Sequence, residues 1–389
     1  MAANKPIKIA IFGSRGIPNR YGGFEEFAEK LSVSLAGRGH DVWVYNSHNH
    51  PCKDQEWNGV KRVLCYDPEH LLGQAGQFIY DLNCINDCRK RNFDILLQLG
   101  YTSSSVWHFR LPPTAIIITN MDGLEWKRNK YSPLTRRFLK HAEKLAVKTS
   151  HHLIADNPAI KEYLAKTHKA SASYIAYGAN IPIITEKSSN TPEDIVINLN
   201  DRMIKLQPKA YYLLIARLQP DNHIEEIIQG VLQSGSKYPL LVIGNESTRY
   251  GRYLKKKYHS EQFVFSGSIF EKEVLDRLRQ GSRIYFHGHS VGGTNPSLLE
   301  AMAASANICA HDNPFNRAVL QNNALYFTRT ADISETIQNN EENMHFPERI
   351  KQNLNKIEEE YGWDFICKQH EMLFKKLLAD DSKHQEIKK

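Results

Sequence analysis

The sequence of 389 residues lacks the features that mark secreted, membrane-spanning or zinc-stabilised proteins. Its six cysteines are scattered and include no CxxC pair, whereas zinc sites and disulfide frameworks need closely spaced pairs. The cysteines are therefore expected to be reduced thiols, as in cytosolic proteins. No secretory signal pattern opens the chain, and no apolar run reaches the roughly 20 residues that cross a bilayer. We expect a cytoplasmic protein.

The sequence also has only a small excess of positive charge. It holds 50 lysines and arginines against 43 aspartates and glutamates, which gives a net charge of +7. This bias fits anionic ligands or an anionic surface, but a nucleic-acid-binding protein should carry more. No Asp-x-Asp motif follows an expected strand, and we expect His287 and His289 on opposite faces of one strand, where they form no metal site with His311. Neither a metal nor a nucleic acid is expected as a partner.

Short apolar stretches typical of buried strands alternate with helical patterns, which predicts an α/β fold with two Rossmann-like domains. We expect a first domain at residues 1–185, a linker at 186–207, a second domain at 208–362, and a C-terminal helix and tail at 363–389. The linker is predicted from its many turn-forming residues. The expected strands lie at 7–12, 42–45, 95–99, 115–119, 152–155 and 174–176, and then at 211–215, 239–243, 263–265, 283–286 and 307–310.

A glycine-containing loop follows the first expected strand, which is a near-continuous apolar run. Gly13 and Gly16 lead into a segment that contains Pro18 and the pair Gly22 and Gly23, and a helical pattern comes next. Dinucleotide-binding folds need G-x-G-x-x-G in a tight turn. The longer loop here therefore argues against a dehydrogenase.

The most informative stretch is Ile284–Ala304, IYFHGHSVGGTNPSLLEAMAA, in which a strand, a loop of small residues and a helix follow one another. Asn295 is a favoured N-cap residue, and Pro296 suits the first helical position. The backbone N–H groups of Ser297 and Leu298 are expected to lack intrahelical partners, so that they and the positive helix pole attract phosphate. The alternative is a capped helix of a buried α/β unit that binds nothing.

The end of this stretch, Glu300-Ala301-Met302-Ala303, resembles the nucleotide-sugar signature of retaining GT-B glycosyltransferases of family 4. In that signature two glutamates eight positions apart flank the phosphate-binding loop. The second corresponds to Glu300, whereas the first falls on Gly292. The run H-S-V-G-G-T-N-P-S-L-L-E-A-M looks like a bacterial rhamnosyltransferase-like subgroup. The resemblance covers most of the chain and implies an acceptor-side domain and a nucleotide-sugar-binding domain that face a cleft, with the C-terminal helix crossing back to the first domain.

The resemblance implies three catalytic residues. Glu300 would accept hydrogen bonds from a ribose diol, and Arg217 would grip the diphosphate with its fixed fork of donors. Asn222 stands where a second cation, a lysine, is usual in the family. Asp122, within D-G-L-E-W-K-R, lies near where other members place a histidine that contacts the donor sugar. A solvated Arg217 and an Asp122 that only caps a turn are the alternatives.

The remaining donor-binding residues are expected in loops that follow strands, where open α/β sheets bind ligands. The resemblance implies that no cofactor is needed beyond the nucleoside-diphosphate sugar, which is a substrate. These donor-binding residues are Gly22, Gly23, Gly244, Ile269, Gly293, Thr294, Asn295, Ser297 and Leu298.

A basic stripe is expected on one helix. Residues 127–148 hold eight lysines or arginines against one acidic residue, Glu143. The stripe consists of Arg137, Lys140, Lys144 and Lys148. A solvated helix face and contact with anionic lipid at the inner face of the plasma membrane are equally weighted interpretations.

The leading hypothesis is a metal-independent, retaining hexosyltransferase. It would move a sugar, with L-rhamnose as the candidate, from a nucleoside diphosphate to a growing bacterial surface polysaccharide or lipid-linked oligosaccharide. One alternative is a nucleotide-sugar 2-epimerase, which shares the two-domain shape and a similar diphosphate site. Another is a non-catalytic protein that binds a sugar nucleotide or a glycan, because Gly292 and Asn222 depart from the family pattern.

Overall fold

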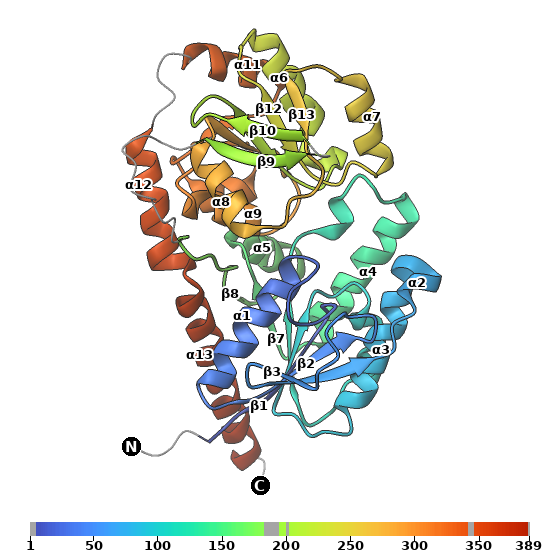
Figure 1. Ribbon diagram of the computed structural model, residues 1–389. Coiled ribbons are helices and arrows are strands. Elements are labelled where there is room, and N and C mark those ends of the chain that lie inside the picture. The colour runs from blue at the N-terminus through green and yellow to red at the C-terminus, as the bar shows by residue number, and fades with distance from the viewer. Residues whose placement is uncertain (1–4, 183–193, 200–201, 341–345, 388–389) are drawn as a thin grey trace. The chain divides into compact units, whose positions relative to one another are not determined.

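The structure is a computed structural model that describes residues 5–182, 194–199, 202–340 and 346–387. The chain divides into two compact units (Figure 1). The first combines residues 1–126, 131–178 and 363–389, and the second combines residues 127–130 and 179–362. Each unit contains a largely parallel sheet with helices, so the predicted fold class of two Rossmann-like α/β domains is confirmed.

The described strands of the first unit form one sheet in the order β3-β4-β2-β1-β5-β6-β7-β8. Neighbouring strands are parallel except at the β3–β4 edge. The order of the strands along the chain reverses between β1 and β5. The strands are β1 (Lys8–Phe12), β2 (Asp41–Ser47), β3 (Glu56–Trp57), β4 (Val60–Cys65), β5 (Ile95–Leu99), β6 (Ile116–Asn120), β7 (His152–Ala155) and β8 (Ala172–Tyr174).

Helical elements connect most of these strands, because parallel neighbours need a crossover connection. The apolar residues of α1 repeat at helical spacing, and Phe27, Leu31 and Leu35 are buried. The helical elements of the first unit are α1 (Gly23–Gly37), α2 (Glu69–Leu72), η1 (Gly73–Ala75), α3 (Gly76–Cys88), η2 (Ser104–Arg110), η3 (Glu125–Lys127, whose last residue is grouped with the second unit), α4 (Pro133–Thr149), α5 (Pro158–Tyr163), η4 (Leu164–His168) and α13 (Trp363–Ile387).

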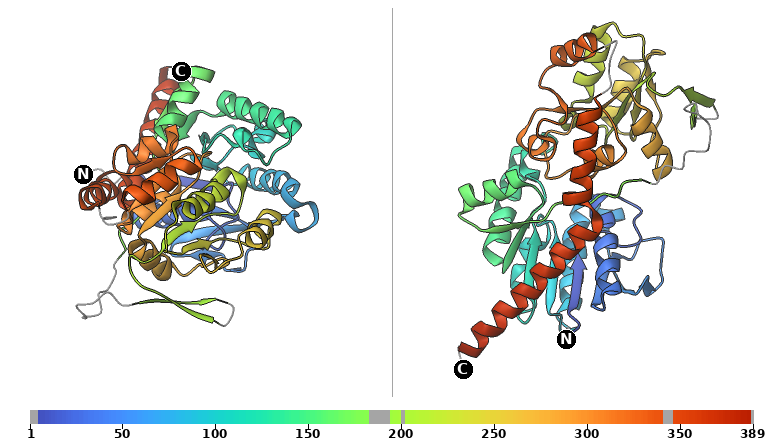
Figure 2. Two further views of the ribbon diagram at one scale, coloured as in Figure 1. Left: turned by 90° about the horizontal axis from the view of Figure 1, so that it is seen from above. Right: turned by 90° about the vertical axis from the view of Figure 1, so that its left-hand side faces the viewer.

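The last helix, α13, belongs to the first unit and packs against α1 (Figure 2). Its Trp363 ring lies beside Phe27 and so close to Gly178 that a Cβ on this glycine would come within 2.5 Å of the ring. Glu371 on α13 accepts a hydrogen bond from Arg38 at 3.2 Å and lies 3.2 Å from His40. The predicted return of the C-terminal helix to the first domain is confirmed.

The main sheet of the second unit is parallel and has the order β13-β12-β11-β14-β15-β16 among the described strands. Its strands are β11 (Tyr212–Ile215), β12 (Leu240–Ile243), β13 (Phe263–Phe265), β14 (Ile284–His287), β15 (Ile308–His311) and β16 (Leu325–Phe327). Its helical elements are η5 (Pro220–Asn222), α6 (Ile224–Ser234), α7 (Arg249–Lys257), α8 (Lys272–Gly281), α9 (Pro296–Ala303), α10 (Pro314–Leu320), α11 (Thr330–Asn339), α12 (Pro347–Lys356) and η6 (Ile357–Tyr361).

An antiparallel hairpin of β9 (Ile195–Leu199) and β10 (Arg202–Leu206) precedes this sheet. It occupies part of the range 186–207 that was expected to be a linker. The β-branched run Ile195-Val196-Ile197 favours a strand there and outweighs the turn-forming residues further upstream. The other residues of that range at 186–193, 200 and 201 lie outside the described residues.

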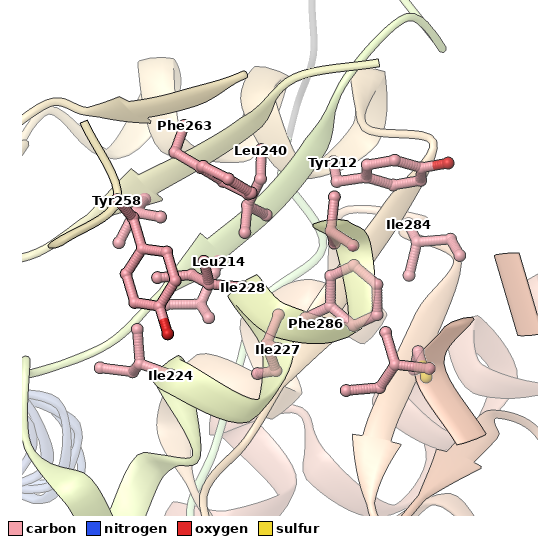
Figure 3. Close-up of a cluster of buried hydrophobic side chains, with 14 of the residues drawn as sticks. Tyr212, Leu214, Ile224, Ile227, Ile228, Leu240, Tyr258, Phe263, Ile284 and Phe286 are labelled. Atoms are coloured by element: carbon pink, nitrogen blue, oxygen red, sulfur yellow. The ribbon is translucent and has the colours of Figure 1, made fainter. Parts of the chain in front are cut away.

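The core of the second unit forms where α6 packs on the sheet (Figure 3). Ile224, Ile227 and Ile228 recur at helical spacing and give α6 an apolar face. They pack in one cluster with Leu214 of β11 and Phe286 of β14. Each fully buried side chain of this size contributes about 1.5–3 kcal/mol. The cluster holds β11 and β14 side by side.

The core of the first unit contains a buried carboxyl group, Asp81 on α3. The Ser103 hydroxyl donates a hydrogen bond to it at 2.5 Å, and the Gln77 amide donates another at 2.9 Å. Burial raises the pKa of Asp81 to about 7. The folded state therefore keeps a proton on Asp81 at pH values where the unfolded chain, with an ordinary pKa, has lost it.

The raised pKa of Asp81 makes the first unit less stable as the pH rises. Its stabilising contribution is complete below about pH 4 and is lost as the pH passes through about 7. Asp81→Asn should remove this dependence and give a higher free energy of unfolding at pH 8, by an amount on the order of a few kcal/mol. Urea unfolding of the parent and the variant at pH 5, 6.5 and 8 measures this change in the free energy of unfolding.

Asp87→Asn on the same helix is the control. Burial would raise the pKa of Asp87, but its hydrogen bonds to Arg91 and Tyr45 lower it instead. The stability due to Asp87 is therefore lost only below its ordinary pKa. Between pH 5 and 8, this variant should show the same change of unfolding free energy with pH as the parent protein. Equal slopes for Asp81→Asn and the parent would contradict the prediction.

Candidate active site

The second unit places its candidate site where the order of strands reverses, between β11 and β14. Ligands of open α/β sheets bind outside the carboxyl ends of strands at such a point. Arg217 follows β11, and the segment from Gly288 follows β14. The loops are tightly packed, because a Cβ on Gly288 would lie 2.0 Å from the carbonyl oxygen of Asn222, and one on Gly244 would lie 2.2 Å from that of Ala216.

The helix start predicted at Asn295 is present as the N-terminus of α9. The Asn295 side chain accepts a hydrogen bond from the backbone N–H of Ser297 at 2.9 Å, and its carbonyl accepts one from Leu298 at 3.0 Å. The expectation that these two N–H groups have no partner within the helix start is therefore wrong. The reason is that Asn295 supplies both acceptors. An anion would meet the positive pole of α9 beside Gly293 and Thr294, which precede the cap.

Gly292 has a backbone conformation that side chains rarely adopt, with φ at +151°. A Cβ added there would meet no heavy atom within 4 Å. The space for a side chain exists, but any L-residue would strain the backbone as it stands. The glycine is thus matched to the conformation of this loop.

The carboxylate of Glu300 forms an ion pair with Arg279 of α8. The Arg279 side chain is only 2% exposed and forms a second ion pair, with Asp276, at 3.0 Å. Burial would lower the pKa of Arg279, but the charges of Glu300 and Asp276 help to raise it instead. Arg279 therefore fixes the position of Glu300, which remains 26% exposed. Nothing in the sequence marks Arg279 as a buried partner of Glu300, because a charged residue inside a helix carries no signal of its burial.

Arg217 is exposed, and the loop that carries it is held by Asn222. The buried Asn222 amide donates a hydrogen bond to the Arg217 carbonyl at 2.7 Å. The family's lysine position is therefore occupied by a residue that orders the loop through its amide.

His287 and His289 stack with their ring centroids 4.5 Å apart. The expectation that they lie in one strand and point to opposite faces is wrong, because β14 ends at His287 and residues two apart in a strand would in any case share a face. Burial and the positive charges of Arg217 and Arg128 lower the pKa of His289 to about 3, and burial also lowers the pKa of His287. Both rings are therefore neutral at pH 7. Among the described residues, no group of three or more His, Cys, Asp or Glu side chains is arranged to hold a metal ion.

The loops after β12 and β13 contain the other two predicted donor-binding positions of this unit. The backbone N–H of Gly244 donates to the carbonyl of Gly267 at 2.9 Å, which holds the two loops together. Ile269 is half-buried, and the neighbouring Phe270 is 82% exposed. The role of Gly244 and Ile269 in binding a nucleobase stays a prediction.

In the first unit, carboxylates and amides hold the glycine loop after β1. Glu25 accepts a hydrogen bond from the Arg15 N–H at 2.8 Å, and Glu29 accepts one from the Asn19 N–H at 2.5 Å. The Asn19 side chain in turn accepts from the N–H of Gly22 at 3.2 Å. The Tyr177 hydroxyl donates to the carbonyl of Gly23. This network fixes Gly22 and Gly23 at the start of α1.

Asp122 follows β6 and has a left-handed backbone conformation, with φ at +46°. Its N–H donates to the Asn120 side chain at 3.1 Å. Asp122 is half-buried. The Asn120 side chain therefore orders this turn, and both roles considered for the Asp122 carboxylate, a turn cap and a contact with donor sugar, stay predictions.

The segment after Asp122 is anchored by Glu143, a buried residue of α4. Its carboxylate accepts hydrogen bonds from the Trp126 indole at 3.1 Å and the Tyr163 hydroxyl at 2.7 Å, and lies 2.7 Å from His168 Nε2. The Tyr101 hydroxyl also donates to it, at 3.3 Å. The sequence marks Glu143 only as the one acid in a basic stretch, since its partners are distant in the chain.

The basic stripe lies on the exposed face of α4, and its four members Arg137, Lys140, Lys144 and Lys148 are all exposed. The Lys140 ammonium sits 4.0 Å from the centroid of the Trp126 ring, a favourable cation–π distance. Leu134 is 77% exposed on the same helix. No helix in the described part of the chain has the length and apolar character needed to cross a membrane.

Arg279→Met should strongly destabilise the second unit, because it leaves Asp276 buried without its arginine partner and Glu300 without its counter-charge. Removing one partner of a buried ion pair costs about 3–5 kcal/mol. Arg277→Met on the same helix removes an exposed charge and should change the free energy of unfolding by less than about 0.5 kcal/mol. Urea unfolding of both variants tests this, and equal effects would show that the Arg279 pairs are not needed for stability.

Comparisons with known proteins agree with this architecture. Residues 7–180 match a family model described as a domain of unknown function (DUF1972), and residues 197–357 match the model of glycosyl transferases group 1. A search of curated protein sequences finds no match.

Solved structures share the fold over almost the whole chain. Sucrose-phosphate synthase from Thermosynechococcus elongatus is 16% identical, with a TM-score of 0.78 over 96% of this chain and 100% of that chain. Anabaena HepE, solved with UDP and glucose, is 12% identical, with a TM-score of 0.68 over 95% and 99%. A glycosyltransferase from Rickettsia africae is 11% identical, with a TM-score of 0.67 over 96% and 99%. The chain therefore has the two-domain GT-B fold, and its second unit carries the match to glycosyl transferases group 1.

Proposed function

We propose that this protein is a glycosyltransferase that takes its sugar from a nucleoside-diphosphate donor. The observation that carries the proposal is the reversal of strand order between β11 and β14, with Arg217 on one loop and the capped start of α9 on the other. This arrangement occurs within the unit that matches glycosyl transferases group 1. The similar fold of HepE, solved with UDP and glucose, supports the same class of donor. The comparisons give the 2-epimerase alternative no support.

The residues of the second unit have distinct roles in this proposal. Arg217 stabilises the negative charge that develops on the departing diphosphate, together with the positive pole of α9. Glu300, held by Arg279, accepts hydrogen bonds from the ribose diol of the donor. We further propose a reaction with retention and without a metal, in which the acceptor hydroxyl attacks from the side that the diphosphate leaves and the diphosphate takes its proton. The protein then contributes positioning and electrostatics.

L-rhamnose is the sugar we propose, with a growing surface polysaccharide or lipid-linked oligosaccharide as the acceptor. The proposal rests on the resemblance of residues 284–304 and on Gly292. Glycine provides no carboxylate to accept hydrogen bonds from sugar hydroxyls. A 6-deoxy sugar has one hydroxyl fewer and a methyl group that prefers apolar surroundings, so it loses less in such a pocket than a fully hydroxylated hexose.

Turnover with a panel of donors tests the proposed function. We expect sugar transfer to a lipid-diphosphate-sugar acceptor, with dTDP-L-rhamnose preferred over UDP-glucose, UDP-N-acetylglucosamine and GDP-mannose, and with full activity in EDTA. A preference for one of the other donors would reject rhamnose but keep the glycosyltransferase. Binding of donors without any turnover would favour the non-catalytic alternative, and conversion of a donor in the absence of acceptor would favour an epimerase.

The exposed stripe on α4 leads us to propose contact with anionic lipid, which fits a lipid-linked acceptor. Replacing Arg137, Lys144 and Lys148 with Gln should weaken binding to liposomes that contain anionic lipid, because each charge is worth about 1 kcal/mol near the surface. Lys140 is left in place because it stacks on Trp126. The control is a second triple variant, in which the exposed Arg249, Arg252 and Lys256 of α7 are replaced with Gln, so that the same charge is lost elsewhere. Co-sedimentation at low salt that does not distinguish the two triple variants would leave the stripe as an ordinary solvated face.

A further inference from the structure

Residues 127–130 are grouped with the second unit, although the residues on either side of them belong to the first. The backbone N–H of Asn129 donates to both carboxylate oxygens of Asp221, at 3.1 and 3.2 Å. Asp221 is buried. Its carbonyl accepts hydrogen bonds from the backbone N–H of Ser290 at 3.3 Å and from the Ser290 hydroxyl at 2.9 Å. The short segment is thus attached where the loops after β11 and β14 meet.

This attachment brings Arg128, the residue before Asn129, to the loops that carry Arg217 and His289. The positive charges of Arg128 and Arg217 both lower the pKa of the His289 imidazole, so both guanidinium groups lie within electrostatic reach of this ring. The Nδ1 atom of His289 is buried and has no hydrogen-bond partner among the described residues. A buried polar atom without a partner is costly unless a ligand or water satisfies it.

Two guanidinium groups close together repel each other, and a ligand with more than one negative charge relieves that repulsion. A diphosphate is such a ligand, and each guanidinium can hold two of its oxygens. The loop after β11 offers only Arg217 as a cation, since Asn222 uses its amide on the Arg217 carbonyl. A second cation for the diphosphate would therefore come from another part of the chain.

We propose that Arg128 is this second cation, and that Arg128, Arg217 and the Nδ1–H of His289 together bind the diphosphate of the nucleotide sugar. The inference rests on the proposed function, because it specifies how the same donor is held. It assigns part of the D-G-L-E-W-K-R segment to the phosphate site of the second unit. On this proposal, Arg128 and Arg217 together make the site prefer a ligand with two phosphates over a ligand with one.

Isothermal titration calorimetry of the full chain with pyrophosphate, UDP, dTDP, GDP and the matching nucleoside monophosphates tests the proposal. Arg128→Gln and Arg217→Gln should each weaken binding of the best nucleoside diphosphate about ten- to a hundredfold, as expected for charge-assisted hydrogen bonds. Affinity for the monophosphate should fall much less. The double variant should show coupling between the two changes, because both groups hold one ligand.

Lys127→Gln is the matched control, since it removes the same charge one residue away and should bind diphosphate as the parent does. Arg128→Lys keeps the charge and should recover part of the affinity, which separates loss of the anion contact from damage to the fold. Unchanged diphosphate affinity in a folded Arg128→Gln variant would overturn this inference and leave the proposed function standing. Absence of nucleoside-diphosphate binding by the parent would overturn both.

Discussion

The geometry of parallel strands is the constraint on which the rest of this structure depends. Strands that run in one direction end at one edge of the sheet, and the loops that follow them must share the space there. In the second unit this crowding is severe, because Gly244 and Gly288 each lie where a single Cβ would collide with a neighbouring carbonyl oxygen. Such close packing turns separate loops into one rigid surface. Arg217, Gly293 and the start of α9 owe their common location to it.

Buried carboxylates perform a similar function in both units. Glu143 orients Trp126 in the first unit, and the pairing of Arg279 with Asp276 and Glu300 orients Glu300 in the second. A buried ion pair is weak evidence of net stabilisation, because desolvation costs nearly as much as the pairing returns. Its geometric effect is clearer, since a charged side chain held by several partners has one favourable position. The first arrangement fixes a residue of the segment that follows β6, and the second fixes a residue of α9.

The sequence predicted the features that depend on neighbouring residues. Apolar runs indicated most strands of the two parallel sheets, although β3, β4, β9, β10 and β16 were not predicted. The Asn295-Pro296 pair indicated the start of α9 correctly. The sequence could not show contacts between distant residues, such as those of Glu143 with Tyr163 and His168 or of Asp221 with Asn129. The same limit explains why Asn295 was recognised as a cap while its consequence for Ser297 and Leu298 was missed. The error over His287 and His289 had a different origin, since the period of a strand already requires that they share a face.

The position of α13 bears on how the protein is made. The first unit consists of residues from the beginning of the chain and of residues from 363 onward, with Trp363 filling the space above Gly178. A ribosome therefore releases the whole second unit before the first can be completed. Until then Phe27 and Tyr177 lack the ring that covers them. The first unit is therefore completed last, and until α13 docks the earlier half of the chain keeps an exposed apolar surface that chaperones can bind.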